Sequence, residues 1–488
     1  MSVSNSNSRW DHHLGKNYIG GRYVQGGDTP LNVCDPATGD VIAQQAMASE
    51  LDIDKAVAAA RKLIDSREFV ALRPVERARM VQKMGQYLSE HCDSIAMMLS
   101  RESGKPFWEA VIEVQGSARY FEYYGNQAET VEGRSIPLGD QYIDFTQYEP
   151  LGISAQIIPW NYPLEMAARS IAPALATGNA CIVKSPELDP LTSICFAAAA
   201  EAADLPAGAL NILCGVGATA GAALASHPDI NQIVFTGSVE TGVRIATAAA
   251  KNVVPCVLEL GGKSAAIVRS DADLDNLIGN VRWGIFFNAG QVCSAMSRVL
   301  VDRSIHQAFV ERAAELAGSL PIDHGVSLRT EGESMGAMVS VAQRDRAMGL
   351  VERAQAQGAR LIAGGQIPRD GAFLQPTVFD QVAPNSEIFQ TEVFGPVLSV
   401  TPFDTDAQAL SLANGTDYGL VAGVFTQDIS AAMHLAQRLR AGQVFVNEWF
   451  AGGVETPFGG YGKSGYGREK GREALLNYVH TKNVAIRI

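Results

Sequence analysis

The chain has 488 residues, with 39 Lys and Arg against 52 Asp and Glu, a net charge of −13, and 47% hydrophobic residues. This length provides for about three domains of ~150 residues each, and for a large core that needs no disulfide bonds. The negative charge, with no dense Lys/Arg block to offset it, disfavours binding to nucleic acids or to membrane surfaces.

The cysteines and the absence of targeting signals predict a cytoplasmic protein. Seven cysteines are scattered without a C-x-x-C pair, which is typical of reduced, intracellular proteins. Residues 1–13 are polar and lack the apolar core of a signal peptide. No run of about 18 uninterrupted apolar residues could span a membrane. The eight histidines lack metal-ligand spacing, so no metal site is predicted.

The segment before Gly152 is predicted to be mainly helical, with Ser49 and Asp52 as a capping pair. From Gly152 onward, short apolar runs alternate with Ala-rich segments of helical length, such as 164–176 and 191–203. The predicted strands are 153–158, 181–183, 210–213, 233–235, 256–260 and 265–268. Such alternation predicts a parallel sheet with helices on its faces.

A second series of apolar runs follows Cys293 and predicts a second α/β domain. Its strands are expected at 298–301, 360–363, 397–400, 421–425 and 444–446, with helical stretches such as 343–357 between them. Two further extended segments, 141–148 and 478–488, fit neither sheet. Because solitary strands need partners, we expect them to pair across subunits, with an edge hairpin within one chain as the alternative.

Four segments combine Gly or Pro with reactive side chains. They are 159–163 (PWNYP), 235–238 (FTGS), 258–263 (LELGGK) and 290–294 (GQVCS). The first three lie at or just beyond the end of a predicted strand or at a loop-to-helix join, and the last follows the apolar run 283–287. Ligands of open α/β sheets bind at the carboxyl ends of the strands, so these segments are candidates for a site.

Cys293 is the candidate nucleophile, because a Gly-flanked loop with small neighbours on its far side would leave its thiol accessible; a buried, inert cysteine is the alternative. A thiolate that attacks a carbonyl needs a donor for the oxyanion and, for hydrolysis, a base. Asn161 can offer its amide, and Glu259 is a base whose pKa burial would raise. The alternatives are a turn residue for Asn161, and a cap or ion-pair partner for Glu259.

Three other motifs are weaker. Residues 215–221 run G-x-G-x-x-x-G, one residue longer than the usual dinucleotide fingerprint, and 262–264 lack the first Gly of a P-loop. Residues 332–336 match the G-x-S-x-G elbow of serine hydrolases around Ser334. That elbow requires a buried strand directly before it, whereas residues 327–331 are mostly polar.

Taken together, the four segments resemble the aldehyde dehydrogenase superfamily, in its NAD(P)-dependent, non-acylating form. Residues 392–397 (EVFGPV), 458–460 (FGG) and 463–465 (KSG) match its pattern as well, and the similarity extends over essentially the whole chain. The resemblance implies an α/β fold with two doubly wound Rossmann-like domains and a small β oligomerisation element. The predicted parts are an NAD-binding domain (1–128 and 149–261), a catalytic domain (262–461) and the oligomerisation element (129–148 and 462–488).

The resemblance also implies oxidation of an aldehyde to a carboxylic acid. Cys293 would attack the aldehyde, and Asn161 with the Cys293 backbone N–H would hold the oxyanion. After hydride transfer to the nicotinamide, Glu259 would activate a water molecule that hydrolyses the thioester and releases the acid. The presence of Glu259 argues for hydrolysis over transfer to coenzyme A.

NAD is the cofactor that the resemblance implies, and NADP is less favoured because a carboxylate at Glu187 would repel a 2′-phosphate. Gly217, Gly237 and Ser238 would approach the pyrophosphate, and Glu392 with Phe394 would position the nicotinamide ribose and ring. The full set of predicted cofactor residues is Ile157, Pro159, Trp160, Lys184, Glu187, Gly217, Gly221, Phe235, Gly237, Ser238, Leu260, Glu392 and Phe394.

The substrate tunnel of the family maps to Tyr162, Glu165, Met166, Arg169, Phe287, Val292, Phe450, Gly452 and Phe458. Semialdehyde relatives use an Arg at the position of Arg169, but Glu165 lies four residues earlier and is an alternative partner for it. Phe287 replaces a second Arg of succinic semialdehyde enzymes. We therefore expect an aromatic or functionalised aldehyde, a semialdehyde among the alternatives.

The family commonly forms homodimers and homotetramers, and we expect this chain to do the same. Two other classes of function remain open. A serine hydrolase would use Ser334 and act without NAD. A catalytically silent structural relative would have no need to keep Cys293, Glu259 and Asn161 together, so the intact trio favours an enzyme.

Overall fold

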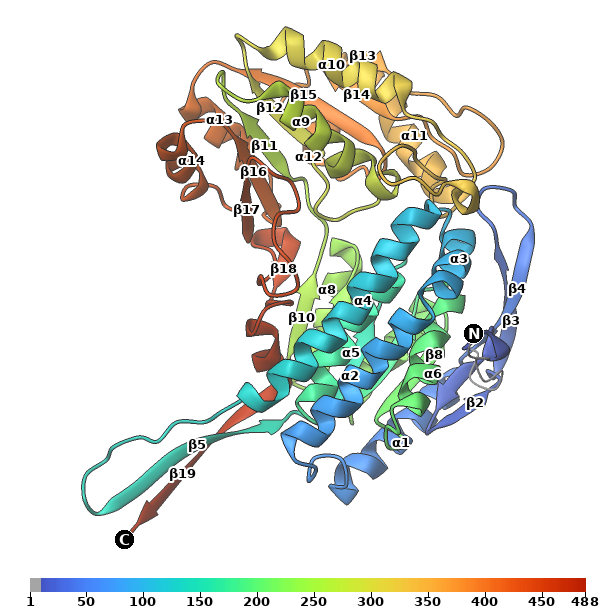
Figure 1. Cartoon of the computed structure of the whole chain (residues 1–488), viewed down its shortest axis with the longest axis vertical. Coiled ribbons are helices and arrows are strands. Elements are labelled where there is room, and N and C mark those ends of the chain that lie inside the picture. The colour runs from blue at the N-terminus through green and yellow to red at the C-terminus, as the bar shows by residue number, and fades with distance from the viewer. Residues whose placement is uncertain (1–9) are drawn as a thin grey trace, which may run out of the picture.

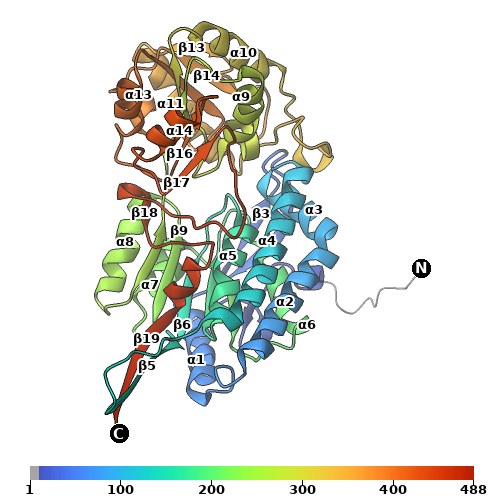
Figure 2. The ribbon, with the colours of Figure 1, turned by 60° about the vertical axis from the view of Figure 1, so that its left-hand side comes forward.

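The computed structural model describes residues 10–488 and shows helices packed around two large sheets (Figures 1 and 2). The predicted α/β class is confirmed. The prediction that the polar opening is no signal peptide falls mainly on residues 1–9, which lie outside the described residues. Among residues 10–488, no helix combines the length and the apolarity needed to cross a lipid bilayer.

The first sheet has eight strands, of which the middle five are parallel. Strands β6, β7 and β8 are buried along their whole length, because helices cover both faces, and this explains their continuous apolar runs. In spatial order the strands are β18 (Gly465–Tyr466), β10 (Cys256–Glu259), β9 (Gln232–Thr236), β6 (Ile153–Ile157), β7 (Ala180–Ser185), β8 (Leu210–Cys214), β1 (Asn17–Ile19) and β2 (Arg22–Val24).

Helices pack on both faces of this sheet and alternate strand residues point into two separate cores. In β7, Cys181 and Val183 join the core beneath α2 to α6, whereas Ile182 joins the core beneath α1, α7 and α8. Helices α2 and α4 lie toward the viewer in Figure 1. The helices are α1 (Glu50–Ser66), α2 (Pro74–Glu90), α3 (Cys92–Ser103), α4 (Phe107–Gln127), α5 (Pro163–Ala176), α6 (Cys195–Ala202), α7 (Ala222–Ser226) and α8 (Val239–Ala250).

The prediction of a mainly helical N-terminal segment is correct from residue 50 and wrong before it. The capping pair of α1 forms, since the Asp52 carboxylate accepts hydrogen bonds from the backbone N–H and hydroxyl of Ser49. Residues 17–47 instead supply strands, which are β1, β2, β3 (Asp28–Cys34) and β4 (Val41–Met47). β1 pairs with the distant strand β8, a tertiary contact that local periodicity does not report.

The second sheet has seven strands, and all neighbouring pairs except β13 with β14 are parallel. Its order is β13 (Arg360–Ala363), β14 (Thr377–Asp380), β15 (Val397–Phe403), β12 (Arg298–Asp302), β11 (Ala265–Val268), β16 (Val421–Phe425) and β17 (Gln443–Val446). Its helices are α9 (Leu274–Val281), α10 (His306–Ser319), α11 (Val341–Ala356), α12 (Glu387–Gln390), α13 (Asp406–Ala413) and α14 (Ile429–Ala436). The sequence did not predict β14, because polar residues at both of its ends leave only two apolar residues.

The chain crosses from the first sheet to the second between β10 and β11. Glu259 ends β10, Gly261 and Gly262 lie in the crossing, and β11 begins at Ala265. The order of strand, double Gly and strand therefore places a carboxylate where the chain passes between the two sheets.

A two-stranded ribbon of β5 (Tyr142–Pro150) and β19 (Val479–Arg487) projects from the body of the molecule (Figure 1). The two predicted extended segments pair with each other within the chain, antiparallel over nine residues. The expected pairing across subunits stays a prediction. The alternative of pairing within one chain is correct, but the partners come from distant parts of the chain rather than from a hairpin. Sequence spacing could not join them, because their contact has no local signature.

Arg298 fixes the start of β12 to the crossing between the sheets. Its guanidinium donates to the carbonyls of Lys263 at 2.8 Å, Leu412 at 2.9 Å and Ala413 at 2.9 Å, and its Cζ lies 4.7 Å from the centre of the Phe389 ring. Arg298 is among the largest fully buried side chains. A single side chain therefore satisfies three carbonyls that are otherwise shielded from water.

Substitution Arg298→Met is expected to lower the free energy of unfolding by about 3–5 kcal/mol, because three buried carbonyls lose their donors. The matched control is Arg303→Met, which removes a solvent-exposed pair with Asp404 and should cost less than about 1 kcal/mol. Equilibrium unfolding in guanidinium chloride measures both values. Equal losses for the two variants would contradict the role of Arg298.

Candidate active site

Two of the four Gly/Pro segments are joined directly by hydrogen bonds. Asn161 follows β6, and its side-chain Nδ2 donates to the backbone carbonyl of Gln291 at 2.9 Å. The Nδ2 of Asn288 donates in return to the backbone carbonyl of Asn161 at 2.8 Å. Asn161 is therefore fixed to the turn that presents Cys293.

The turn before Cys293 has an unusual backbone. Asn288, Ala289 and Gly290 have φ values of 48°, 51° and 71°, in the left-handed region that non-glycine residues rarely adopt. A Cβ at Gly290 would lie 2.2 Å from the carbonyl oxygen of Gly395, so only Gly fits there. Close packing against the 392–397 segment thus determines where Cys293 stands.

The Cys293 thiol is partly exposed and lines a cavity, yet its surroundings disfavour ionisation. Burial raises the pKa of Cys293 to about 12, Arg169 lowers it, and Glu392 and Glu259 raise it further. At neutral pH the thiol is therefore protonated in the protein alone. A cationic group that comes close to the sulfur would favour the thiolate.

Glu259 is 2% exposed, and neither of its carboxylate oxygens accepts a hydrogen bond from any described residue. Burial raises the pKa of Glu259 well above its ordinary value, Glu469 adds to the rise, and Arg169 opposes it. The rise predicted from the sequence is correct in direction. A carboxyl group with free oxygens and a raised pKa is suited to general-base chemistry on water.

A cavity of about 420 Å³ opens in front of Cys293. All nine residues that the sequence assigned to the substrate tunnel line it, together with the Cys293 side chain. The ring of Tyr162 stacks near Phe287, with centroids 6.2 Å apart. The wall is predominantly aromatic and apolar, as expected for a small-molecule site.

The sequence missed several residues of this wall. Tyr120, Trp283 and Lys470 also line the cavity. The neighbouring Trp449 is buried behind the wall, and its indole N–H donates to the carbonyl of Ser294 at 3.1 Å. A Trp on a helix or a Lys near the C-terminus carries no local signal of a cavity, so only packing identifies them.

Arg169 does not pair with Glu165, the partner that the sequence offered within the chain. Its guanidinium forms a buried ion pair with Glu469, and its Cζ lies 5.3 Å from the centre of the Phe458 ring. Glu165 instead accepts a hydrogen bond from the hydroxyl of Tyr120 at 3.3 Å. The expected pairing of Arg169 with Glu165 is therefore wrong. The backbone of Glu469 forms a β-bridge with Phe458, whose ring lies beside Arg169. Both residues are far from Arg169 in the sequence, so local spacing does not report this pair.

The predicted cofactor residues gather at the carboxyl ends of the parallel strands of the first sheet. Ile157 pairs with Lys184 on one neighbouring strand and with Phe235 on the other. Lys184 Nζ lies 2.6 Å from the Glu187 carboxylate, which also accepts a hydrogen bond from the backbone N–H of Gly217. Two donors thus hold the Glu187 carboxylate at the carboxyl ends of the strands.

Neighbouring loops complete this group. The hydroxyl of Ser238 caps α8 and accepts from the Thr241 N–H at 3.3 Å, and a Cβ at Gly237 would lie 2.5 Å from the ring of Phe235. Gly242 of α8 packs closely on Leu260. Gly221 ends a π-helical turn that begins at Gly217, and Pro159 lies in the loop after β6.

The 392–397 segment meets both sheets near Cys293. Glu392 accepts a hydrogen bond from the backbone N–H of Gly262 at 3.1 Å, and burial raises its pKa to about 7. A Cβ at Gly261 would lie 2.2 Å from the Glu392 carboxylate. The ring of Phe394 packs edge-on against Trp160 at 5.2 Å. Because Gly261 has no side chain, the Glu392 carboxylate can lie against the backbone of the 258–263 segment.

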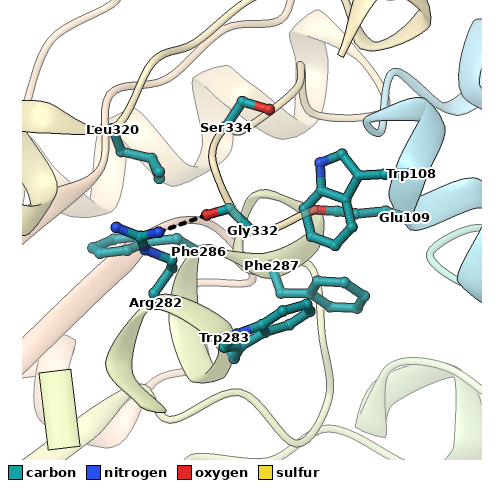
Figure 3. A pocket seen from close by; sticks show the side chains of 9 residues that line it. All are labelled: Trp108, Glu109, Arg282, Trp283, Phe286, Phe287, Leu320, Gly332 and Ser334. Atoms are coloured by element: carbon teal, nitrogen blue, oxygen red, sulfur yellow. Dashed lines mark hydrogen bonds between the residues drawn. The ribbon is translucent and has the colours of Figure 1, made fainter. Parts of the chain in front are cut away.

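Ser334 lines a second pocket, together with Trp108 and Trp283 (Figure 3), and it does not line the cavity in front of Cys293. It belongs to a loop, and residues 327–334 contain no strand, so the geometry of a nucleophile elbow is absent there. Close by, the rings of Trp108, Trp283 and Phe287 pack with centroids 5.4–5.7 Å apart.

Within residues 10–488, no three His, Cys, Asp or Glu side chains are grouped so as to hold a metal ion.

Comparison with known proteins agrees with this geometry. The profile described as "Aldehyde dehydrogenase family" matches residues 23–484. The chain belongs to the aldehyde dehydrogenase family. The family predicted from the sequence is thereby confirmed, and with it an enzyme class of oxidoreductases that act on aldehydes.

Three relatives of this aldehyde dehydrogenase are informative. Retinal dehydrogenase 2 of Mus musculus is 40% identical over 460 residues, which cover 93% of this chain and 88% of the relative. An aldehyde dehydrogenase of Bacillus cereus in complex with NAD+ superimposes with a TM-score of 0.96 at 36% identity, covering 100% and 99%. A mutant indole-3-acetaldehyde dehydrogenase of P. syringae, in complex with NAD+ and IAA, gives 0.95 at 34%, covering 98% and 99%.

The raised pKa of Cys293 predicts how it reacts with iodoacetamide, which modifies the thiolate. In the protein without cofactor, the rate at Cys293 is expected to increase about tenfold per pH unit between about pH 7 and 9, because this range lies below a pKa of about 12. Peptide mass spectrometry measures the rate, with the exposed Cys34 as a check that the reagent is active. A Cys293 rate that levels off within this range would contradict the assignment.

Proposed function

We propose that this aldehyde dehydrogenase oxidises an aldehyde to a carboxylic acid with NAD, through a thiohemiacetal and a thioester on Cys293. The observation that supports this most directly is that Asn161 is hydrogen-bonded to the turn carrying Cys293, at a cavity that Cys293 lines. The Cys293 thiol gives up its proton to water in the cavity, and the thiolate Sγ bonds to the carbonyl carbon as the C=O π electrons move to the oxygen. The developing oxyanion accepts hydrogen bonds from Asn161 Nδ2 and the Cys293 backbone N–H.

The residues at the first sheet fit NAD. Ribose hydroxyls can donate to the Glu187 carboxylate, which Lys184 and the Gly217 N–H hold at the sheet edge, and a 2′-phosphate would meet this carboxylate as a like charge. Glu392 and Phe394 are proposed to orient the nicotinamide ribose and ring. NAD, when bound, supplies the carbon that accepts the hydride. The NAD+ complexes among the relatives support this choice.

Release of the acid requires water to attack the thioester. Glu259 is proposed to remove the proton from that water, which it can do only in its ionised form. Because its pKa is raised, the rate of hydrolysis increases with pH through that raised value. Neither other class of function gains a supporting observation, since Ser334 has no strand before it and the three proposed catalytic side chains are intact.

Production of NADH tests the reaction. Cys293→Ser is expected to abolish aldehyde oxidation while NAD still binds. Glu259→Gln should slow thioester hydrolysis by about 10²- to 10⁴-fold, so that the acyl-enzyme accumulates in intact-mass spectra and the rise of its hydrolysis rate with pH disappears. Full NADH production by Cys293→Ser would refute the proposed function, and fast turnover without an acyl-enzyme in Glu259→Gln would refute the base.

For the substrate, we propose an aromatic or otherwise functionalised aldehyde. The support is the 420 Å³ cavity and its aromatic side chains, including Tyr162, Phe287, Phe450 and Phe458. Relatives whose names specify retinal and indole-3-acetaldehyde are consistent with this class. Because Glu469 neutralises Arg169, the cation in the wall that has no ion-pair or hydrogen-bond partner among residues 10–488 is Lys470.

A substrate panel tests this proposal. Substituted benzaldehydes are expected to give a higher kcat/KM than short unsubstituted aliphatic aldehydes, because aromatic rings bury more surface against the cavity wall. Lys470→Gln should raise KM for ω-carboxy semialdehydes and leave KM for benzaldehydes unchanged. The best turnover with short aliphatic aldehydes would contradict the proposed class.

The proposed assembly is a homodimer or homotetramer in the cytoplasm. The ribbon of β5 and β19 exposes Tyr142, Ile143 and Ile486, and an isolated two-stranded ribbon is only marginally stable, which supports packing against a second subunit. The seven free cysteines support a reducing compartment.

We further propose that the first sheet and its helices bind NAD (1–128 and 149–261), that 262–461 form the catalytic domain, and that 129–148 and 462–488 join subunits. Within this last range, β18 pairs with β10 as an edge strand of the first sheet.

A further inference from the structure

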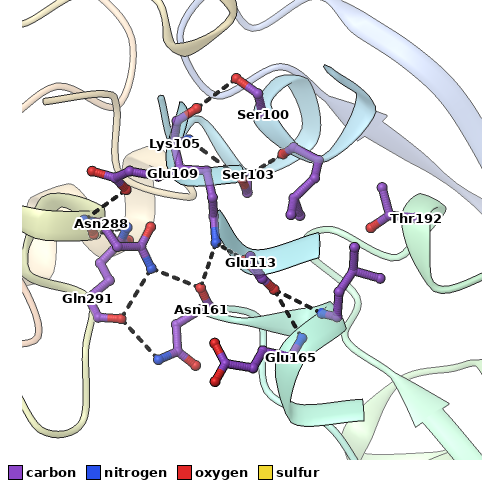
Figure 4. A network of polar contacts seen from close by, with 12 residues as sticks. Ser100, Ser103, Lys105, Glu109, Glu113, Asn161, Glu165, Thr192, Asn288 and Gln291 are labelled. Carbon is purple, nitrogen blue, oxygen red and sulfur yellow. Dashed lines mark hydrogen bonds and ion pairs between the residues drawn. The ribbon is translucent and has the colours of Figure 1, made fainter. Parts of the chain in front are cut away.

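A buried ion pair lies next to Asn161 (Figure 4). Lys105, in the loop between α3 and α4, forms an ion pair with Glu113 of α4 at 2.5 Å. The same Nζ donates to the backbone carbonyl of Asn161 at 3.0 Å. Both side chains are at most 1% exposed, so this contact is shielded from solvent.

Glu113 also holds the chain on the far side of Asn161. One of its oxygens accepts hydrogen bonds from the backbone N–H groups of Leu164 at 2.9 Å and Glu165 at 3.3 Å. These are the first N–H groups of the 14-residue helix α5, which have no partners within the helix. The Lys105 ammonium lies 4.6 Å from the centre of the Tyr162 ring between them. One ion pair thus fixes residues 161–165.

A second contact from α4 reaches the Cys293 turn. Glu109 accepts a hydrogen bond from the backbone N–H of Asn288 at 2.9 Å, and Asn288 Nδ2 donates to the same Asn161 carbonyl as Lys105 does. The Asn161 carbonyl therefore has two donors, one from the Lys105 side and one from the Cys293 turn. The backbone of Asn161 has little freedom to move relative to Cys293.

A buried ion pair is a poor device for stability, since the desolvation of two charges often exceeds their attraction. The pair of Lys105 and Glu113 instead fixes the backbone of residues 161–165. We propose that Lys105 and Glu113 are positioning residues for aldehyde oxidation, which hold the Asn161 backbone so that its side-chain amide meets the oxyanion on Cys293. This inference rests on the proposed function of Asn161.

A double-mutant cycle tests it with the full-length protein. The paired substitution Lys105→Met with Glu113→Gln leaves no unpaired buried charge. It is expected to lower the rate of hydride transfer, measured as the first turnover of NADH formation, by about 10- to 100-fold, because a misplacement of about 1 Å can reduce rates to that extent. KM for NAD should be unchanged.

The decisive measurement repeats the paired substitution in an Asn161→Ala background. If Lys105 and Glu113 act through Asn161, the pair should lower the rate less than about twofold further there, since contacting residues that act as one unit are not additive. A full 10- to 100-fold loss in both backgrounds, or no loss in either, would overturn the proposal. An Asn161→Ala variant with normal hydride transfer would instead show that the oxyanion role itself is wrong.

Glu102→Gln is the matched structural control. Glu102 is a fully buried carboxylate that accepts from the N–H groups of Leu191 and Thr192 at the start of another helical turn, away from Asn161. It should lower thermal stability but leave hydride transfer unchanged. Should the paired variant not fold, Lys105→Met alone leaves Glu113, whose pKa burial raises, to take up a proton and still offer an oxygen to α5, and it is expected to fold with an intermediate loss of rate. An unchanged rate in this variant would also overturn the proposal.

Discussion

Exclusion of water from ionisable side chains is the constraint on which the active site of this aldehyde dehydrogenase depends. Burial raises the pKa of Cys293 to about 12, that of Glu392 to about 7, and that of Glu259 well above its usual value. Each group is therefore biased toward its neutral form in the protein alone. Charges that approach the site act through a low dielectric, so each of them shifts the balance strongly.

Three buried cations near the site have carboxylate partners. Arg169 with Glu469 lies beside the cavity, Lys105 with Glu113 lies next to Asn161, and Lys184 pairs with the partly exposed Glu187 after the carboxyl end of β7. Each pair joins groups that would be costly to bury singly. The arrangement leaves Glu259 and Cys293 without an ionic partner of their own, which is the condition under which a base and a nucleophile stay available for reaction.

Two sheets are needed because no single one could supply all of these groups. The first sheet presents Asn161, Glu187, Gly217 and Glu259 at the ends of its strands, and the second carries Glu392 and supports the turn before Cys293. The crossing between β10 and β11, held in place by Arg298, brings the two sets together. Close approach at Gly261 and Gly290 then leaves room for neither side chain nor solvent.

The amino-acid sequence by itself determined the α/β class, most strands after residue 152, the family, and nine of the residues that line the cavity with Cys293. The class and the strands follow from local patterns, since helical and strand periodicity records contacts within an element and its immediate turns. The cavity residues follow from the resemblance of the motifs to aldehyde dehydrogenases. The strands at 17–47, the pairing of β5 with β19, the partner of Arg169 and the contact of Lys105 with Asn161 were decided only in the tertiary structure. They join segments far apart in the chain, and such contacts depend on how many side chains pack at once, which no local spacing records.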